Sequence, residues 1–206
     1  MPHEGDSTQV EVGARTMTTV NVPVRERLIE AATDLFYAHG LRAVSADKII
    51  ERVGTTKVTF YRHFRTKDDL VVTYLEGRAA LERQGVTGAI EQAGGDVDTA
   101  LRLISEALDS VACSPGFRGC PFINAAAEYP DPASPVRQVI DAHRTWWTKT
   151  FEQLVAPLGL PAPAAVADDL MVLRDGAMVA GYLGDPSAAA GSFLRGCQAI
   201  LRHPHQ

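Results

Sequence analysis

Residues 44–64 contain two short helical segments separated by one glycine, and this pattern constrains the fold more than any other stretch of the chain. Ser45 is a suitable N-cap for a first helix with three apolar residues on one side, Ile49, Ile50 and Val53. Gly54 follows directly, where the end of a helix favours a left-handed residue. Thr56 then caps a second helix over residues 57–64. The pattern predicts a helix-turn-helix.

The second of these helices has two kinds of side chain. Apolar and aromatic bulk comes from Val58, Phe60, Tyr61 and Phe64, and polar groups come from Lys57, Thr59, Arg62 and His63. A short helix with a basic, hydroxyl-rich outer face suits the major groove of DNA, which admits an α-helix and displays donors and acceptors. The alternative is a surface helix in a helical bundle, because helix-turn-helix geometry also occurs in proteins that do not bind DNA.

The charge distribution favours DNA binding. Residues 24–67 carry nine Lys or Arg against five Asp or Glu, a net charge of +4 in a chain whose net charge is −5. A basic segment on an acidic remainder is typical of a DNA-binding unit whose other surfaces avoid DNA.

This part of the chain resembles the DNA-binding domain of the TetR family of bacterial repressors. The resemblance covers roughly residues 24–71 and includes Gly54, Thr56, Thr59, Tyr61, His63, Phe64, Lys67 and Leu70. Upstream, the chain also resembles the family's first helix and the glycine that ends it. The matching residues are Ile29, Ala31, Ala32, Leu35 and Phe36 in the helix and Gly40 at its end. The chain departs from the usual family residues at Val53, Thr55, Thr56 and Val58, so the resemblance does not carry over an operator sequence.

The resemblance implies that some of these residues contact DNA phosphates and others contact bases. Tyr61, His63 and Lys67, together with Ser45, are expected to hold phosphates. Lys67 lies in the first turn of a helix capped by Thr66, where the helix dipole disfavours a cation unless a phosphate is nearby. The expected base-reading residues are Thr56, Lys57, Thr59 and Arg62.

The chain is expected to be all-α, with a three-helix DNA-binding head, a helical-bundle domain for ligand binding and dimerisation, and about nine helices in total. Residues 1–21 are predicted to be a disordered arm, residues 22–71 the head, with its helix-turn-helix at 45–64, and residues 72–206 the effector-binding and dimerisation domain. The first helix is expected between Pro23 and Gly40. The helix capped by Thr66 is expected to run toward Gln84, where glycines loosen the pattern. Further helices are predicted over residues 98–113, 118–129, 135–155, 164–183 and 187–202.

A small, largely apolar effector is expected to bind among the helices of residues 98–182. Aromatic residues, a histidine and a methionine suit a mostly apolar pocket with few polar anchors. The segment over residues 118–129 adds an asparagine and a glutamate which, if both face inward, need partners. The candidate effector residues are Phe122, Asn124, Glu128, His143, Trp146, Trp147 and Met178. For each of them, a place in the core without a ligand remains the alternative.

The resemblance also implies that the last two helices, residues 164–183 and 187–202, pair with those of a second copy. Small residues there allow close helix packing, and an intramolecular hairpin is the alternative. No apolar run is long enough to span a bilayer and no secretory signal is visible, so we expect a cytoplasmic protein.

Catalysis is not expected, and neither a metal site nor a cofactor is predicted, because phosphate-loop, dinucleotide and zinc-spacing motifs are absent. The function predicted is a homodimeric transcriptional repressor released from a palindromic, double-stranded DNA operator by its effector. Two alternatives stay open. One is an all-α small-molecule-binding protein or enzyme with a vestigial helix-turn-helix. The other is a regulator that senses redox state through Cys113 and Cys120, although buried, reduced cysteines are the expected state.

Overall fold

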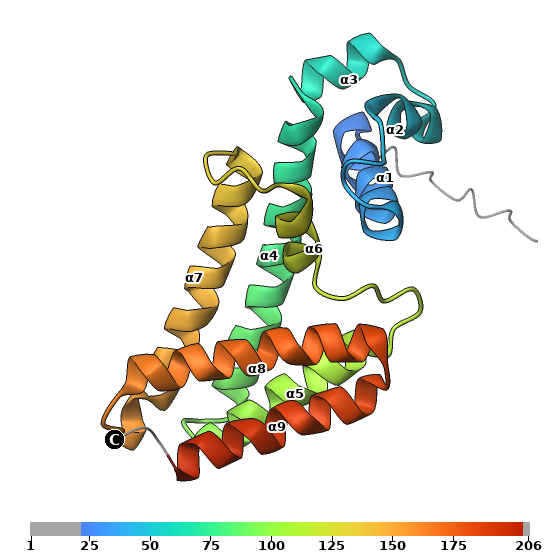
Figure 1. The fold of residues 1–206 in the computed structure, drawn as a ribbon. Coiled ribbons are helices and arrows are strands. Elements are labelled where there is room, and N and C mark those ends of the chain that lie inside the picture. The colour runs from blue at the N-terminus through green and yellow to red at the C-terminus, as the bar shows by residue number, and fades with distance from the viewer. Residues whose placement is uncertain (1–21, 204–206) are drawn as a thin grey trace, which may run out of the picture.

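The computed structural model describes residues 22–203, so the expected N-terminal arm lies outside the described residues. Throughout the described residues the regular structure is helical, with nine α-helices and one short 3-10 turn, which confirms the all-α prediction (Figure 1). The elements are α1 (Val24–His39), α2 (Ala46–Val53), α3 (Lys57–His63), α4 (Lys67–Gln92), α5 (Val97–Ala112), α6 (Pro121–Glu128), α7 (Pro135–Val155), η1 (Ala156–Leu158), α8 (Pro163–Leu183) and α9 (Pro186–Arg202).

Helices α1, α2 and α3 and the first turns of α4 form one end of the molecule, which we call the head (Figure 1). Its core is made of buried apolar side chains from all four helices, among them Leu28, Phe36, Ile49, Phe60 and Leu70. Each of these side chains comes from the apolar stripe of its own helix, so the local periodicity of the sequence and the packing of the head agree.

Helix α4 joins the head to the rest of the molecule, which we call the body. Thr66 and Asp69 form a complete capping box at its start. The helix does not loosen at Gly85 as predicted but continues to Gln92. A glycine inside a helix costs only about 1 kcal/mol relative to alanine, and burial of Val86 beyond Gly85 offsets that cost.

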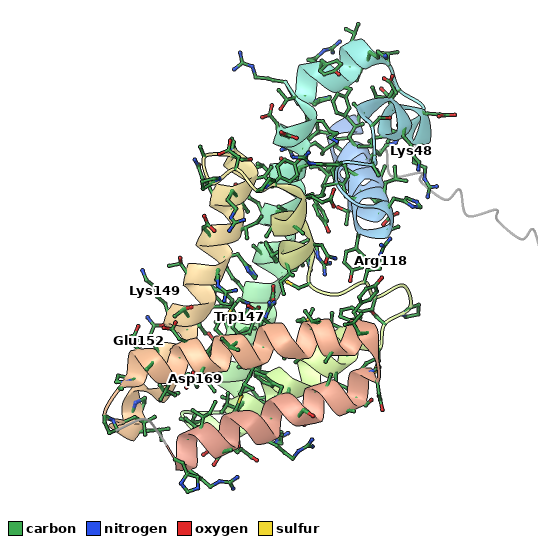
Figure 2. All side chains as sticks on the ribbon, viewed as in Figure 1. Lys48, Arg118, Trp147, Lys149, Glu152 and Asp169 are labelled. Carbon is green, nitrogen blue, oxygen red and sulfur yellow. The ribbon has the colours of Figure 1, made fainter. Side chains whose placement is uncertain are left out.

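The body is built around α4 (Figure 1). Helix α7 runs beside α4, α8 crosses both of them, and α5 and α9 lie along α8, while α6 lies between α1 and the α4–α7 pair. Its largest buried side chain is that of Trp147, which projects from α7 into the space between α7, α4 and α8 (Figure 2). Phe151 on α7 and Phe193 on α9 are also fully buried, so the body has a continuous core of its own.

Helices α8 and α9 pack closely, as the small residues in their sequences predicted. At Gly196 on α9, an added Cβ would lie 2.9 Å from Leu173 Cδ1 on α8, which is closer than carbon atoms pack. Glycine at this position therefore sets the spacing of the pair. Among the described residues, no helix is both long and apolar enough to cross a membrane.

Candidate functional site

The turn between α2 and α3 has the geometry that the sequence predicted. Ser45 Oγ accepts a hydrogen bond from Lys48 N at 3.2 Å, and Gly54 ends α2 in the left-handed region with φ 67°. Thr56 Oγ1 accepts from Thr59 N at 3.2 Å and so caps α3. Because the caps fix both helices, α3 is held in one orientation on the head.

Helix α3 is buried on one side and exposed on the other. Phe60 is completely buried and packs against Phe64. On the opposite side Val58 is 73% exposed and Tyr61 is 50% exposed. Of the residues predicted to contact DNA, six are exposed, namely Ser45, Thr56, Lys57, Tyr61, Arg62 and His63, whereas Thr59 and Lys67 are half-buried. The structure therefore brings the predicted DNA-contacting residues together around one short helix.

The family resemblance places Val58 where operator sequence is read, although no DNA contact was assigned to it. A valine so exposed at the start of a helix has nothing to pack against within the head. Apolar side chains in a major groove contact the C5-methyl group of thymine. The signal in the sequence was its position between Lys57 and Thr59, but exposure separates it from the core residues of the same helix only once the fold is known.

Lys57 is paired with an acid of α2. Its Nζ lies 2.9 Å from Asp47 Oδ1, and both side chains are largely exposed. The hydrogen bond and the charge of Asp47 raise the pKa of Lys57 above its usual value. The Asp47 carboxylate therefore competes with DNA for the ammonium group of Lys57.

Asp47→Asn is therefore expected to strengthen DNA binding by roughly two- to fivefold, because it removes a negative charge beside the phosphates and releases Lys57. Fluorescence anisotropy with labelled duplex DNA at fixed salt measures the change. Asp141→Asn on α7 is the control, since it makes the same charge change in an exposed helical ion pair of the body. Unchanged or weaker binding by Asp47→Asn would show that Lys57 does not face the DNA.

Lys67 has a structural role that the sequence did not reveal. Its Nζ donates to Leu41 O at 2.9 Å and to Val44 O at 3.2 Å, in the segment between α1 and α2. These carbonyl groups explain why a cation occurs in the first turn of α4. Because an ammonium group has three donors, one remains for a phosphate. The predicted phosphate contact stays a prediction, and Lys67 also holds the loop before α2.

The body contains a cavity of about 320 Å³ between α4, α5, α6, α7 and α8. Most of its lining is apolar, as in Val86, Ile104, Leu108, Phe122, Trp147 and Met178. Gly85 on α4 also borders the cavity, and no atom lies within 4 Å of the position that its Cβ would take. The charged residues of the lining are Arg78 and Glu82, both on α4. A mostly apolar cavity with few polar groups is typical of a small-molecule site.

Glu82 is the centre of a buried polar cluster beside this cavity. Its Oε1 accepts from Arg174 Nη2 at 2.5 Å and from Trp147 Nε1 at 3.2 Å. Its Oε2 lies 2.7 Å from His143 Nε2. Burial alone raises the pKa of a carboxyl group, but the His143 hydrogen bond and the Arg174 guanidinium lower the pKa of Glu82 to about 2.

The cluster extends along α8 to a second carboxylate. Arg174 is only 1% exposed, and its Nη1 lies 3.2 Å from Asp175 Oδ1. Asp175 is paired in turn with the exposed Arg144, at 2.5 Å. Two carboxylates are thus matched by two guanidinium groups. Sequence analysis missed Glu82 and Arg174, although Arg174 is the one basic residue of α8 and this was a signal for it.

Three of the predicted effector residues, Phe122, Trp147 and Met178, line the cavity. His143 does not line the cavity. It is buried, and its ring is stacked on that of Phe122 at a centroid distance of 3.5 Å. Trp146 is half-buried and lies outside the lining, with its ring edge against Trp147. The two neighbouring tryptophans point in different directions, so only one of them borders the cavity.

Asn124 and Glu128 do not line this cavity. Both line a second hollow of about 250 Å³ between α1 and α6, so their predicted part in effector binding stays a prediction. Asn124 is exposed, and its Nδ2 donates to Arg118 O at 2.8 Å. Glu128 accepts hydrogen bonds from Leu41 N at 2.9 Å and from Arg42 N at 2.6 Å. The reason is that α6 is short and borders the cavity only through its first turn, while its last turn lies against the head.

The three cysteines are free: Cys113 is exposed, and Cys120 and Cys197 are buried. Burial raises the pKa of the Cys197 thiol to about 12. Cys113 Sγ lies near Asp109 and Ser187, whereas Cys120 Sγ lies 3.4 Å from Arg174 Nη1. Two of the three thiols are thus buried, in agreement with the expectation that most of them are, and their reduced state stays a prediction. Among residues 22–203, no cluster of side chains could hold a metal ion.

Helix α8 exposes an apolar stripe on the side away from the core. Val172, Val179 and Leu183 are 63%, 44% and 77% exposed. They are separated by seven and four residues, so they lie on one face of the helix. A shallow groove between this face and α9 is lined by Val172 and Ala180 of α8 and by Ala188 and Ser192 of α9.

Comparison with known proteins agrees with both parts of the fold. Residues 28–73 match the sequence profile of bacterial regulatory proteins of the tetR family. Residues 99–157 match that of a tetracyclin repressor-like C-terminal domain. The two matched segments correspond to the head with the start of α4 and to the stretch from α5 to the beginning of η1.

Solved structures and a curated relative point the same way. A TetR-family transcriptional regulator from Streptomyces coelicolor is 42% identical, with a TM-score of 0.83 over 87% of this chain and 88% of that chain. The reduced form of NemR from E. coli has the same fold, with 19% identity and a TM-score of 0.75 over 86% and 97% of the two chains. The HTH-type transcriptional regulator LmrA of Bacillus subtilis is 24% identical over 136 residues, 66% of this chain and 72% of LmrA.

Proposed function

This chain belongs to the TetR family of bacterial transcriptional regulators, and we propose that it is a homodimeric repressor released from a palindromic operator by a small, largely apolar effector. The observation that carries the DNA-binding part is the outer face of α3, where exposed basic, hydroxyl and aromatic side chains surround a capped helix. We further propose that the protein acts in the cytoplasm and has no catalytic activity.

In the proposed complex, α3 enters a major groove of the operator. Thr56, Lys57, Thr59 and Arg62 reach base edges, and Val58 contacts a thymine methyl group. The phosphates on either side are held by Ser45, Tyr61, His63 and the free donor of Lys67. One head reads only a few base pairs, so two heads on one dimer are needed to read a palindrome.

Effector binding is proposed to act on the head through α6. Phe122, in the first turn of α6, borders the cavity. In the last turn of α6, the Glu128 carboxylate accepts hydrogen bonds from Leu41 N and Arg42 N, which follow the end of α1. Next to Glu128, Tyr129 donates from its hydroxyl group to Asp68 Oδ1 at 2.7 Å, at the start of α4. A ligand that displaces Phe122 therefore shifts contacts with both α1 and α4.

The segment before α6 provides a second link between body and head. Tyr37 Oη on α1 donates to Gly119 O at 3.0 Å and accepts from Arg118 N at 2.9 Å. The guanidinium of Arg118, which lies beside the end of α1 in Figure 2, donates to Ala38 O. Movement of α6 changes both links together and so alters the spacing of the two heads. A coupling of about 1–3 kcal/mol between such sites corresponds to a 5- to 150-fold loss of operator affinity.

The proposed DNA-binding mode is tested with duplex DNA from the region flanking the protein's own gene. Wild-type protein is expected to bind it tightly, with an affinity that falls steeply as salt rises. Arg62→Ala is expected to lose about 1–3 kcal/mol for the preferred sequence and to relax the preference at one base position. Competition with single-base variants of the duplex measures that preference.

Lys149→Ala, which removes a positive charge from an exposed position on α7 in the body, is the control and should leave both affinity and base preference unchanged. If the Arg62→Ala protein ranks the single-base duplex variants by affinity in the same order as the wild-type protein, Arg62 is not a base-reading residue. If the wild-type protein binds no duplex in a salt-dependent way, the head does not bind DNA.

A further inference from the structure

We propose that the effector is an amphipathic organic acid, whose apolar part fills the body cavity and whose carboxylate binds Arg78. This inference rests on the proposed role of the cavity as the effector site, and it adds the chemical class of the ligand. It follows from an imbalance between the two charged residues of the lining, Arg78 and Glu82, which lie one helical turn apart on α4.

Glu82 is already engaged by the protein. Its two oxygens are in contact with Arg174, Trp147 and His143, at 2.5, 3.2 and 2.7 Å. A carboxylate held by three donors has little remaining capacity to bind a cationic or donor-rich ligand. Because Arg174 and Arg144 also match the charge of Asp175, the cluster does not leave an excess negative charge for a ligand to neutralise.

Arg78 is in the opposite situation. It is half-buried, and within residues 22–203 its guanidinium takes part in no ion pair or hydrogen bond with the protein. The other groups facing it from neighbouring elements are Tyr74 on α4 and Asp34 on α1, which borders an adjoining hollow. Asp34 is exposed and is not within ion-pair distance of Arg78. The cavity therefore offers one unmatched positive charge.

The rest of the lining determines the apolar part of the ligand. Phe122, Trp147 and Met178 present aromatic and thioether surface, and Ile104 and Leu108 complete an apolar wall. Gly85, seven residues beyond Arg78 on α4, is exposed and leaves open space at the edge of the site. A carboxylate placed on a half-buried guanidinium forms charge-assisted, bidentate hydrogen bonds. A neutral amide of the same shape loses that interaction, and an amine meets a like charge.

Binding at Arg78 also places the ligand on the helix that carries the head. Arg78 is on α4, whose first turn is tied to Tyr129 and to the segment before α2. An acid bound between Arg78 on α4 and Phe122 on α6 therefore contacts two of the elements that connect the body to the head.

The test uses the full-length protein and three ligands of one shape: 2-naphthoic acid, 2-naphthamide and 2-naphthylmethylamine, with octanoic acid and octanamide as a second matched pair. Isothermal titration calorimetry is expected to give roughly ten- to a hundredfold tighter binding for an acid than for its amide. The amine is expected not to bind. Arg78→Met should reduce the affinity for the acid to that for the amide, and Arg78→Lys should restore part of the difference.

Gly85→Leu, which fills the cavity, should abolish binding of the acids, whereas Gly88→Leu, one turn away and outside the cavity, should not. The inference is overturned if neither acid binds, if acid and amide bind equally, or if Arg78→Met leaves the preference for the acid intact. DNA binding is measured on the same samples. Normal DNA binding together with any of these results rejects the anionic ligand alone, whereas absence of DNA binding by wild-type protein rejects the proposed function.

Discussion

Arg174→Met is expected to lower the free energy of unfolding by about 3–5 kcal/mol, the usual cost of removing one partner from a buried ion pair. Arg174 is almost fully buried and donates to both Glu82 and Asp175. Methionine fills much of the same volume but leaves Glu82 without its guanidinium partner. Urea denaturation at one fixed protein concentration measures the loss, because stability depends on concentration in an oligomer.

Arg144→Met is the matched control, since Arg144 is the exposed partner of Asp175. Its loss should cost no more than about 1 kcal/mol. The double variant Glu82→Gln/Arg174→Met should regain much of the stability lost in Arg174→Met, because the amide is neutral and still accepts from Trp147. A cost below about 1 kcal/mol for Arg174→Met would mean that the cluster is not a closed, buried network.

The same cluster predicts how stability depends on pH. The pKa of Glu82 is lowered from 4.5 to about 2 in the folded protein. A lowered carboxyl pKa stabilises the folded state above the unfolded-state value, and this contribution is lost as the pH falls from about 4.5 to 2. It amounts to roughly 3 kcal/mol at neutral pH. Glu82→Gln should flatten the stability profile in that window, and an unchanged slope there would show that Glu82 does not titrate with folding.

The second large effect is expected at the exposed face of α8. We propose that Val172, Val179 and Leu183 pack against a second copy of the chain, in a four-helix contact formed by α8 and α9. Val179→Glu would place a carboxylate in that contact without a partner, which is strongly unfavourable. The variant is expected to be monomeric and to lose operator affinity by roughly a hundredfold or more, because its two heads no longer bind together.

Leu158→Glu provides a matched control. Leu158 in η1 is 45% exposed and Val179 is 44% exposed, so both changes introduce the same charge at equally exposed apolar positions. Light scattering coupled to size-exclusion chromatography gives the mass of each variant, and anisotropy gives its DNA affinity. A dimeric Val179→Glu with normal DNA affinity would place the dimer contact elsewhere on the molecule.

The head was predictable because its signals are local. Ser45, Gly54 and Thr56 act within one turn of their own position, and their caps and left-handed turn occur in the structure as the sequence indicated. The same holds for α7, which begins at Pro135 and ends at Val155 as predicted. Helix caps and prolines determine where a helix begins and ends without reference to the rest of the fold.

The proposed effector site was only partly predictable because its key contacts join distant residues. Glu82 and Arg174 are 92 positions apart in the sequence, and neither belongs to a motif. Asn124 and Glu128 were named as candidates because they are polar residues in an apolar segment and would need partners if they faced inward. In the fold, α6 presents Phe122 to the cavity and Glu128 to the head. No periodicity within eight residues distinguishes those two directions.

The most direct test of the central claim is selection of bound sequences from a pool of random duplex DNA by the wild-type protein. We predict an inverted repeat whose half-sites lie about one helical turn apart, roughly 34–36 Å, because two copies of α3 must enter successive major grooves. Enrichment of no sequence, or of a single half-site without its inverted copy, would contradict the account of a dimeric, operator-reading regulator.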